Sequence, residues 1–537
     1  MEHNTVFLSA FCGSDTLESI SLAMQYLKDH PGTTLVMEPG VYTITSELAQ
    51  WTRQSVLNGD FGSNPQRTMF HPKFPYTRGM DFAGQRGSRI LAYGVTLMID
   101  GFMEPVSLNH CENIELCGIT IDHTRKPYTH GTVTSITYAD DNNMIVSVTT
   151  GDAFPVTAGT SMTLRQRFYD PPKDCFLSTD SPKNWEWIDA HHLRLHMTRD
   201  DAVKAGMEYY CIHTYHYRPA ILIEHAKNIT LTDVTIHSQP GMGIVGNRSE
   251  DVLIRRLAII PSAGEHWSTN TDATHFTSMK GTLRLENCIS EAHGDDFVNV
   301  HAYYHDVIRR EAPNVCYMQE KTPDGTHAQS LDYPDIGDTL ELTSRDTLQV
   351  LDTFTVMDCV PMPEEWMCKV TLDHPLPDNT DGLMLADVTR LPRLEVVGCT
   401  ITSHYARSIL IKTRNVLIER NFFKNALGMA VEVAAEAGWY EGVGPADVVI
   451  RNNRIVNCGC REAAGVVVKA DAEHAAGQSI YHVTIEDNII DVPFAAHAIF
   501  VRNTDGVTIA RNHCVCTETP IIVRDCKNVV CDNAYDA

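Results

Sequence analysis

Apolar and polar residues alternate in short stretches that recur along the chain. Residues 447–455 read DVVIRNNRI and residues 482–490 read HVTIEDNII, which follow the pattern x-V-x-I-x-x-N/D-x-I. Alternation with a period of two is typical of a half-buried strand. Related stretches begin at Asn228, Asp251, Gly281, Asn415 and Gly506.

The spacing of these stretches predicts a parallel β-helix. Within each run the starts lie roughly 22 to 35 residues apart, a period found in solenoid proteins. In such a fold each coil buries its Val and Ile side chains, while Asn, Asp or Gly occupies a short turn. We therefore expect an all-β fold, a right-handed parallel β-helix with two inserted small β-barrel-like domains.

The repeat divides the chain into five expected segments. Residues 1–122 hold an N-terminal cap and the first coils, 220–301 hold the catalytic coils, and 392–537 hold the C-terminal coils. The repeat is lost in 123–219 and again in 302–391, where alternating runs are separated by turn-forming residues. These two interruptions are predicted to be the inserted β-domains.

The N-terminal segment carries the signals of a capping helix. Residues 13–16 (GSDT) supply N-cap chemistry for the apolar-periodic run from Leu17 to Leu27, and a strand is expected from Thr33 to Met37. A helix over the first coil would cover an otherwise exposed sheet edge.

Three carboxylates are expected to meet on neighbouring coils. Asp272 ends the motif NTD, and Asp295 and Asp296 follow Gly294 after an interval of one coil. Aspartates also cap turns, but like charges this close raise the pKa of at least one group, which is typical of functional sites. Because adjacent residues on a regular strand point to opposite faces, Asp295 and Asp296 share a site only if Gly294 opens a bend or bulge.

Composition narrows the classes of partner. The 43 Lys and Arg residues against 68 Asp and Glu residues give a net charge of −25, which argues against nucleic acid and anionic membranes. No apolar stretch is long enough to cross a bilayer, and the first residues lack the basic region of a signal peptide. We expect a cytoplasmic protein, or a secreted one if a leader precedes this sequence. The oligomeric state is open, with a homodimer as one expectation.

The motifs resemble glycoside hydrolase family 110, the inverting α-1,3-galactosidases. The resemblance is carried by NTD, by residues 294–301 (GDDFVNVH) and by the segment from Ala406 to Gly442 that ends in WYEG. It covers most of the chain, although the family would be expected to have glycine at the positions of Phe297 and Ala302. It implies an exo-acting hydrolase for terminal α-1,3-linked galactose, and it leaves open whether the acceptor is linear Galα1-3Gal or a blood-group B structure.

Two other functions are weighed. Polygalacturonases also carry NTD and GDD one coil apart, but this chain has no Gly-His-Gly motif, and residues 408–412 (SILIK) match the expected Arg-Ile-Lys poorly. A galacturonate carboxylate also needs a basic subsite. A non-catalytic glycan-binding β-helix is the second alternative, in which the carboxylates would be solvated turn residues.

Hydrolysis of an acetal needs an acid for the leaving oxygen and a base for water, and inversion places the two about 6.5 to 9.5 Å apart. We assign Asp295 as the acid, with its pKa raised by its neighbours. Asp272 and Asp296 are expected to position and deprotonate the water. The opposite allocation, with Asp272 as the acid, stays open. Coils lie only about 4.8 Å apart, so the side chains must splay to open the gap.

Further residues are predicted to bind substrate. Trp267, Trp439 and Tyr440 are candidates to stack on galactose, although large aromatics are as often core residues. Arg407 and Lys412 are expected to pair with the aspartates. No cofactor or metal is expected, because the histidine spacings fit no zinc pattern. The remaining candidates are Asn270, His275, His293, Asn299, His301, Glu436 and Glu441.

Overall fold

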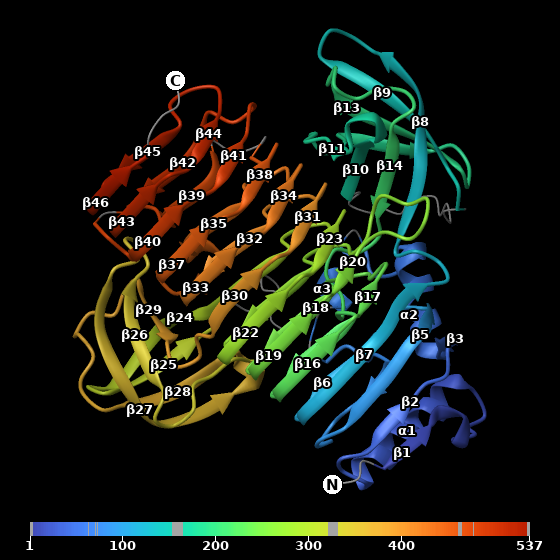
Figure 1. Ribbon diagram of the computed structural model, residues 1–537, viewed down its shortest axis with the longest axis horizontal. Coiled ribbons are helices and arrows are strands. Elements are labelled where there is room, and N and C mark those ends of the chain that lie inside the picture. Colours follow the sequence, from blue (N-terminus) through green and yellow to red (C-terminus); the bar gives the residue numbers. More distant parts are fainter. Residues whose placement is uncertain are drawn as a thin grey trace.

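The computed structural model describes residues 4–62, 64–69, 71, 73–152, 165–320, 331–459, 464–475 and 477–533. Parallel strands stack along the molecule from the N-terminal to the C-terminal end, and two lobes project from this stack (Figure 1). The predicted all-β class and the parallel β-helix are confirmed.

A long sheet of parallel strands from successive coils forms two stacks along the β-helix, because most coils contribute two strands to it. Twenty-two strands of the described residues belong to it. They are β1 (Thr5–Phe7), β2 (Thr34–Val36), β3 (Gly40–Thr45), β5 (Arg89–Asp100), β7 (Glu112–His123), β16 (Lys227–Thr232), β17 (Thr235–Ile236), β19 (Glu250–Arg255), β20 (Ala258–Ile259), β22 (Lys280–Glu286), β23 (Ile289–Glu291), β30 (Arg393–Val397), β31 (Thr400–Thr402), β33 (Arg414–Glu419), β34 (Phe422–Lys424), β37 (Ala446–Arg451), β38 (Arg454–Val456), β40 (Ile480–Glu486), β41 (Ile489–Asp491), β43 (Thr504–Ala510), β44 (His513–Val515) and β46 (Lys527–Asp532).

A second set of parallel strands carries the candidate site. Each strand pairs in register with the strand one coil away, so that His275, Asn299 and Leu410 lie side by side. The set comprises β4 (Arg78–Asp81), β6 (Glu104–Asn109), β15 (Ile221–Glu224), β18 (Ile244–Asn247), β21 (Thr274–Thr277), β24 (Val298–Ala312), β32 (Ile409–Lys412), β35 (Val431–Glu436), β39 (Ala464–Asp471), β42 (His497–Arg502) and β45 (Ile521–Arg524), with β36 (Glu441–Gly442) antiparallel to β24.

The interior of the coils is a continuous apolar core. Ile254, Leu285, Val396 and Ile450 are fully buried, and the same cluster extends along the β-helix. Alternate residues of these strands face outward, as the period of two predicts. The turns hold residues with positive φ, mostly Gly, Asn and Asp, which tolerate this conformation better than most residues.

The N-terminal end is capped by helices. Helix α1 (Thr16–Asp29) begins after Asp15, whose Oδ1 accepts a hydrogen bond of 2.8 Å from the backbone N–H of Glu18. This confirms the predicted capping helix. A second helix, α2 (Glu47–Asn58), and the short α3 (Gln66–Met69) were not predicted. Within the described part of the chain, no helix has the length and apolarity needed to cross a membrane.

The first lobe interrupts the coils between β7 and β15. It is a seven-stranded antiparallel sheet in the order β11-β10-β14-β8-β9-β13-β12, at the upper right of Figure 1. Its strands are β8 (Tyr128–Tyr138), β9 (Asn143–Thr150), β10 (Arg165–Asp170), β11 (Cys175–Phe176), β12 (Asn184–Trp187), β13 (His192–Thr198) and β14 (Glu208–Ile212).

The second lobe grows directly out of the coil that carries Asp295. Strand β24 begins in the β-helix and continues into the lobe, where it pairs antiparallel with β25 and β29. The lobe therefore cannot move far from the site without disturbing that coil. Its other strands are β25 (Val315–Gln319), β26 (Thr339–Ser344), β27 (Val350–Met362), β28 (Met367–Leu372) and β29 (Leu383–Asp387).

Candidate active site

The three aspartates predicted from the sequence come together. Asp272 precedes β21, and Asp295 and Asp296 precede β24, its partner in the next coil. Oxygen atoms of the three carboxyl groups all lie within 4.8 Å of one another. The closeness follows from the parallel register, because the backbone N–H of Ala273 donates to the carbonyl of Asp296 at 2.8 Å.

Gly294 permits this arrangement through close backbone contact. It lies in a bend between β23 and β24, so that Asp295 and Asp296 are not constrained to opposite faces. Its N–H lies 3.0 Å from the carbonyl of Thr269, and a Cβ at position 294 would lie 2.2 Å from the carbonyl oxygen of Asn270. The bend expected at Gly294 is therefore present, and only glycine fits there.

Arg407 holds the Asp296 carboxylate. Its Nε donates to Oδ1 and its Nη2 to Oδ2, each at 2.9 Å, and its backbone N–H donates to Oδ1 at 3.1 Å. Asp296 is only 1% exposed, so this ion pair offsets the cost of burying a charge. The expected pairing of Arg407 with an aspartate is confirmed.

Asp295 is the most exposed of the three aspartates. Burial, followed by the charges of Asp296 and Asp272, raises its pKa to about 8. The direction agrees with the prediction, although burial contributes more than the neighbouring charges. The Tyr215 hydroxyl donates a hydrogen bond to Asp295 Oδ2. Sequence reasoning missed Tyr215, which follows the last strand of the first lobe and carries no motif.

Asp272 is hydrogen bonded to a pair of buried histidines. Its Oδ2 lies 2.6 Å from His275 Nδ1, and His275 Nε2 lies 2.9 Å from His301 Nε2. Burial, followed by the charges of Asp296 and Glu441, raises the pKa of Asp272 well above its ordinary value. Burial lowers the pKa of His275, and it lowers that of His301 to about 3.

Lys412 does not pair with the aspartates as predicted. Its Nζ is fully buried, lies 2.6 Å from Glu436 Oε2 and donates to Glu441 Oε2. Glu441 also accepts from Asn299 Nδ2 at 3.3 Å. The prediction was wrong because Lys412 lies at the far end of β32, beside the chain that returns from η5 (Ala437–Trp439), while the aspartates lie at the strand starts.

The ionic network continues toward the next coils. Arg407 Nη1 lies 3.5 Å from Glu432 Oε2 and 3.7 Å from Glu436 Oε1, and Lys469 Nζ lies 3.4 Å from Glu432 Oε1. Glu432 and Lys469 were not predicted, because nothing in the local sequence distinguishes them from other outward-facing strand residues.

Asn270 lies in the scaffold and not in the site. It is fully buried, and its Nδ2 donates to the carbonyl oxygens of Pro127 (3.1 Å) and Thr214 (2.7 Å). Its Oδ1 accepts from Trp267 Nε1 at 3.2 Å. Trp267 is fully buried as well. Their predicted contacts with galactose are therefore incompatible with this placement, and the two residues fasten the first lobe to the catalytic coil.

His293 is also internal. Its Nδ1 lies 3.0 Å from Ser290 Oγ, and its ring stacks on His404 at 4.1 Å between centroids. Burial lowers its pKa well below the ordinary value. A fully buried ring cannot reach a sugar hydroxyl, so the predicted substrate contact of His293 does not fit the structure.

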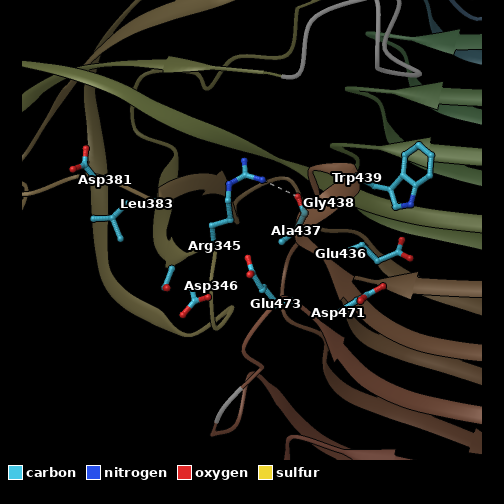
Figure 2. Close-up of a pocket in the computed structure, with 13 residues that line it drawn as sticks. Arg345, Asp346, Asp381, Leu383, Glu436, Ala437, Gly438, Trp439, Asp471 and Glu473 are labelled. Carbon is cyan, nitrogen blue, oxygen red and sulfur yellow. Dashed lines mark hydrogen bonds between the residues drawn. The ribbon is translucent and has the colours of Figure 1, made fainter.

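A pocket of about 600 Å³ is lined in part by Glu436, whose Oε1 lies 3.7 Å from Nη1 of Arg407, the residue that holds Asp296. Figure 2 shows Trp439, Glu436 and Asp471 at one side of it, and Arg345, Asp346 and Asp381 at the other. Trp439 is 54% exposed, as a stacking platform requires. The pocket lies between the coils and the second lobe.

Tyr440 points toward the second lobe instead. Its hydroxyl donates to Asp306 Oδ2 at 2.6 Å, and the Arg345 guanidinium covers its ring at 4.4 Å from the centroid. Arg345 thus covers one face of the ring, and Tyr440 packs against a buried apolar cluster, which does not agree with its predicted stacking on galactose. Phe297 and Ala302, the departures from the expected family pattern, are both fully buried in apolar clusters.

The carboxylates of Asp272, Asp295 and Asp296 are close enough together to hold a cation. Arg407 already supplies a positive charge to Asp296, and the raised pKa values of the other two favour protons on them. This chemistry fits proton transfer.

Comparison with known proteins agrees with this chemistry. Residues 214–317 match the protein family described as "Glycosyl hydrolases family 28". Alpha-1,3-galactosidase A of Bacteroides fragilis is 25% identical over 96% of this chain and 88% of its own length. Alpha-1,3-galactosidase B of Bacteroides thetaiotaomicron is 24% identical over 96% and 87%, and alpha-1,3-galactosidase A of Shewanella woodyi is 24% identical over 94% and 84%. The resemblance predicted from the sequence is confirmed, and the chain is a glycoside hydrolase.

Proposed function

We propose that this protein is an exo-acting α-galactosidase that removes terminal α-1,3-linked galactose from oligosaccharides or glycoconjugates, with inversion at the anomeric carbon. The observation that carries the proposal is the cluster of three carboxyl groups in which Arg407 holds Asp296 as a carboxylate while Asp295 favours its protonated form. The linkage is inferred from the names of the similar proteins.

Asp295 is assigned as the general acid. It has accessible surface, and a pKa of about 8 keeps it protonated at neutral pH. Protonation of the leaving oxygen by such a group is worth about two to four orders of magnitude in rate. Tyr215 holds Oδ2, which leaves Oδ1 for the glycosidic oxygen.

Asp296 is assigned as the base that deprotonates water. Both of its oxygens accept from Arg407, and this double hydrogen bond makes the carboxylate a poor covalent nucleophile. A carboxylate oxygen has a second lone pair, so Oδ2 can still accept a hydrogen bond from water. Attack by water in a single displacement inverts the anomeric centre.

The contact among the carboxyl groups is close. One oxygen of each lies within 4.8 Å of one oxygen of the others, whereas the acid and base of inverting enzymes stand about 6.5 to 9.5 Å apart. Inversion is proposed on the Arg407 contact, and the stereochemistry of the product is its decisive test.

Exo action follows from the second lobe. Strand β24 runs from the catalytic coil into the lobe, and Ser344–Asp346 and residues 381–383 of the lobe form one wall of the pocket beside Glu436. A long polymer passing over the aspartates would meet this wall. We therefore infer that the site accepts a chain end.

Product analysis tests the proposal. We expect release of galactose from Galα1-3Gal, little release from Galα1-4Gal or Galα1-6 substrates, and no internal cleavage of an α-galactan. Proton NMR at early times should show β-galactose first. Initial α-galactose would overturn inversion, and cleavage within a polymer would overturn exo action.

A polygalacturonase-like glycosidase is the second candidate, favoured by the match of residues 214–317 to family 28. Against it, a galacturonate carboxylate needs a basic subsite, and the cations Arg407, Lys412 and Lys469 already contact carboxylates of the protein. The same assay with polygalacturonate separates the two. A glycan-binding protein without activity would release nothing from either substrate.

A further inference from the structure

A chain of hydrogen bonds leads from a backbone carbonyl to Asp272. His301 Nδ1 lies 2.9 Å from the carbonyl oxygen of Ala302. A carbonyl oxygen cannot donate, so His301 Nδ1 must carry a hydrogen. The neutral ring then has only a lone pair at Nε2.

The lone pair at His301 Nε2 determines which nitrogen of His275 carries a hydrogen. The two Nε2 atoms lie 2.9 Å apart, so His275 Nε2 must donate to the lone pair of His301 Nε2. A neutral His275 consequently has its lone pair at Nδ1, which lies 2.6 Å from Asp272 Oδ2. One of these two atoms must supply a hydrogen, and in this tautomer only Asp272 Oδ2 can.

We propose that His275 and His301 are positioning residues that fix a proton on Asp272 Oδ2, directed into the protein, and that Asp272 works as a neutral group while Asp296 is the sole base. The catalytic meaning of this assignment rests on the proposed glycosidase function, whereas the position of the proton does not.

Two other arrangements would ionise Asp272. In the first, His275 would be a cation that donates from both nitrogens while His301 stays neutral, which burial disfavours because it lowers the pKa of His275. In the second, His275 would donate from Nδ1 and His301 would be the cation. His301 is 1% exposed and lies 4.0 Å from Glu441, whose charge Lys412 already offsets. Burial holds the pKa of His301 at about 3, which disfavours the cation.

Charge balance around the aspartates supports the neutral form. Arg407, Lys412 and Lys469 form ion pairs with the carboxylates of Asp296, Glu432, Glu436 and Glu441, and Arg165 lies over the Tyr215 ring on the Asp295 side. Among the described residues no Lys or Arg forms an ion pair with Asp272, so ionising it would add a buried negative charge beside those of Asp296 and Glu441. Buried charges without a partner are strongly unfavourable.

The position of this proton determines which carboxyl group acts as the acid and which ones act on water. The Asp272 proton is bound to His275 and is not available to the glycosidic oxygen, which leaves Asp295 as the acid. Oδ1 of Asp272 can accept a hydrogen bond from the attacking water and orient it toward Asp296. Asparagine has the same shape and can provide both interactions through its amide N–H and its oxygen.

Two measurements test the proposal. Long-range proton–nitrogen NMR correlations on histidine-labelled protein at pH 7, without substrate, should show His301 protonated at Nδ1 and His275 at Nε2, both neutral. In His301→Leu, His275 should shift toward the Nδ1–H tautomer, and His301→Gln should restore the original one because its amide oxygen can accept. The buried His293, identified through His293→Gln, is the internal control.

On the proposed substrate, Asp272→Asn should lose no more than about tenfold in kcat, against about a hundredfold or more for Asp296→Asn. A cationic His275 or His301, a His275 Nδ1–H tautomer in the wild-type protein, or equal losses in the two asparagine variants would overturn the proposal. Failure of the wild-type protein to hydrolyse any α-galactoside would overturn the proposed function, while the tautomers would still be read by NMR.

Discussion

The guanidinium of Arg407 holds the carboxylate of Asp296 through two hydrogen bonds of 2.9 Å, from Nε to Oδ1 and from Nη2 to Oδ2. This contact joins two consecutive coils at the base of the site. It gives Asp296 a fixed orientation and a compensated charge, while Asp295 beside it has no such cation within hydrogen-bond reach among the contacts of the described residues. Two adjacent aspartates therefore have different chemistry.

The first prediction concerns this contact. Arg407→Lys keeps the positive charge but loses the planar pair of donors, and we expect kcat to fall at least about tenfold because Asp296 is no longer fixed. Steady-state kinetics and thermal unfolding would be measured together. Arg511→Lys is the matched control, since Arg511 holds Asp487 through two bonds of 2.7 Å at an exposed turn. Equal activity of both variants would contradict the role of Arg407.

The second prediction is the alkaline limb of the pH profile. Asp295 must be protonated to act as acid, and its pKa is raised to about 8 by burial and by Asp296 and Asp272, against the opposing influence of Arg407 and Tyr215. Activity should thus be present below pH 8 and be lost as pH rises through that value. This loss should be measured in kcat/KM, whose pH dependence reports the pKa values of the free enzyme. A limb that began below pH 6 would exclude Asp295 as the acid.

Tyr215 provides the third prediction. Its hydroxyl donates to Asp295 Oδ2 and stabilises the ionised carboxylate, so it lowers the pKa of Asp295. In Tyr215→Phe this hydrogen bond is lost, and the alkaline limb should move to higher pH. The measurement is the profile of kcat/KM against pH for both proteins. Tyr138→Phe, on the exposed end of β8, serves as control. A limb that moved to lower pH in Tyr215→Phe would contradict the assignment.

The fourth prediction concerns the bend that brings the aspartates together. Gly294→Ala places a Cβ against the backbone carbonyl of Asn270, so the bend must open and kcat should fall about a hundredfold or more, as for loss of acid–base catalysis. The control is Gly151→Ala in the first lobe, because nothing lies within 4 Å of an added Cβ there. Normal activity of Gly294→Ala would show that the bend is not required.

The sequence predicted the convergence of the aspartates because one physical rule governs it. In a parallel solenoid, residues one repeat apart lie side by side, so the interval between Asp272 and Asp295 could be converted into proximity. The capping helix was predictable for a similar reason, since Asp15 and the apolar period are local signals. Both features depend on short-range or strictly periodic information.

Other parts of the site could not be predicted because they depend on long-range packing. Tyr215 reaches Asp295 from the end of the first lobe, 80 positions earlier in the chain. Asn270 and Trp267 lie in an irregular turn, where the sequence does not show which side chain faces inward. Both face inward, where their hydrogen bonds hold the lobe. Lys412 ends strand β32, but its partners come from a later turn.

The last prediction concerns the pocket beside Glu436. Trp439 presents an exposed ring there, and a sugar that stacks on an aromatic face gains about 1 kcal/mol, or roughly a fivefold change in affinity. Because the pocket lies away from the acid Asp295 and next to the second lobe, we expect the ring to contact the acceptor sugar rather than the terminal galactose. Trp439→Ala should raise KM for Galα1-3Gal by roughly fivefold and leave kcat nearly unchanged. A nitrophenyl galactoside, which lacks the second sugar, should be affected less. Phe494→Ala, with a side chain 73% exposed on a distant coil, is the control. A large loss of kcat in Trp439→Ala with an unchanged KM would place the ring at the reacting sugar instead.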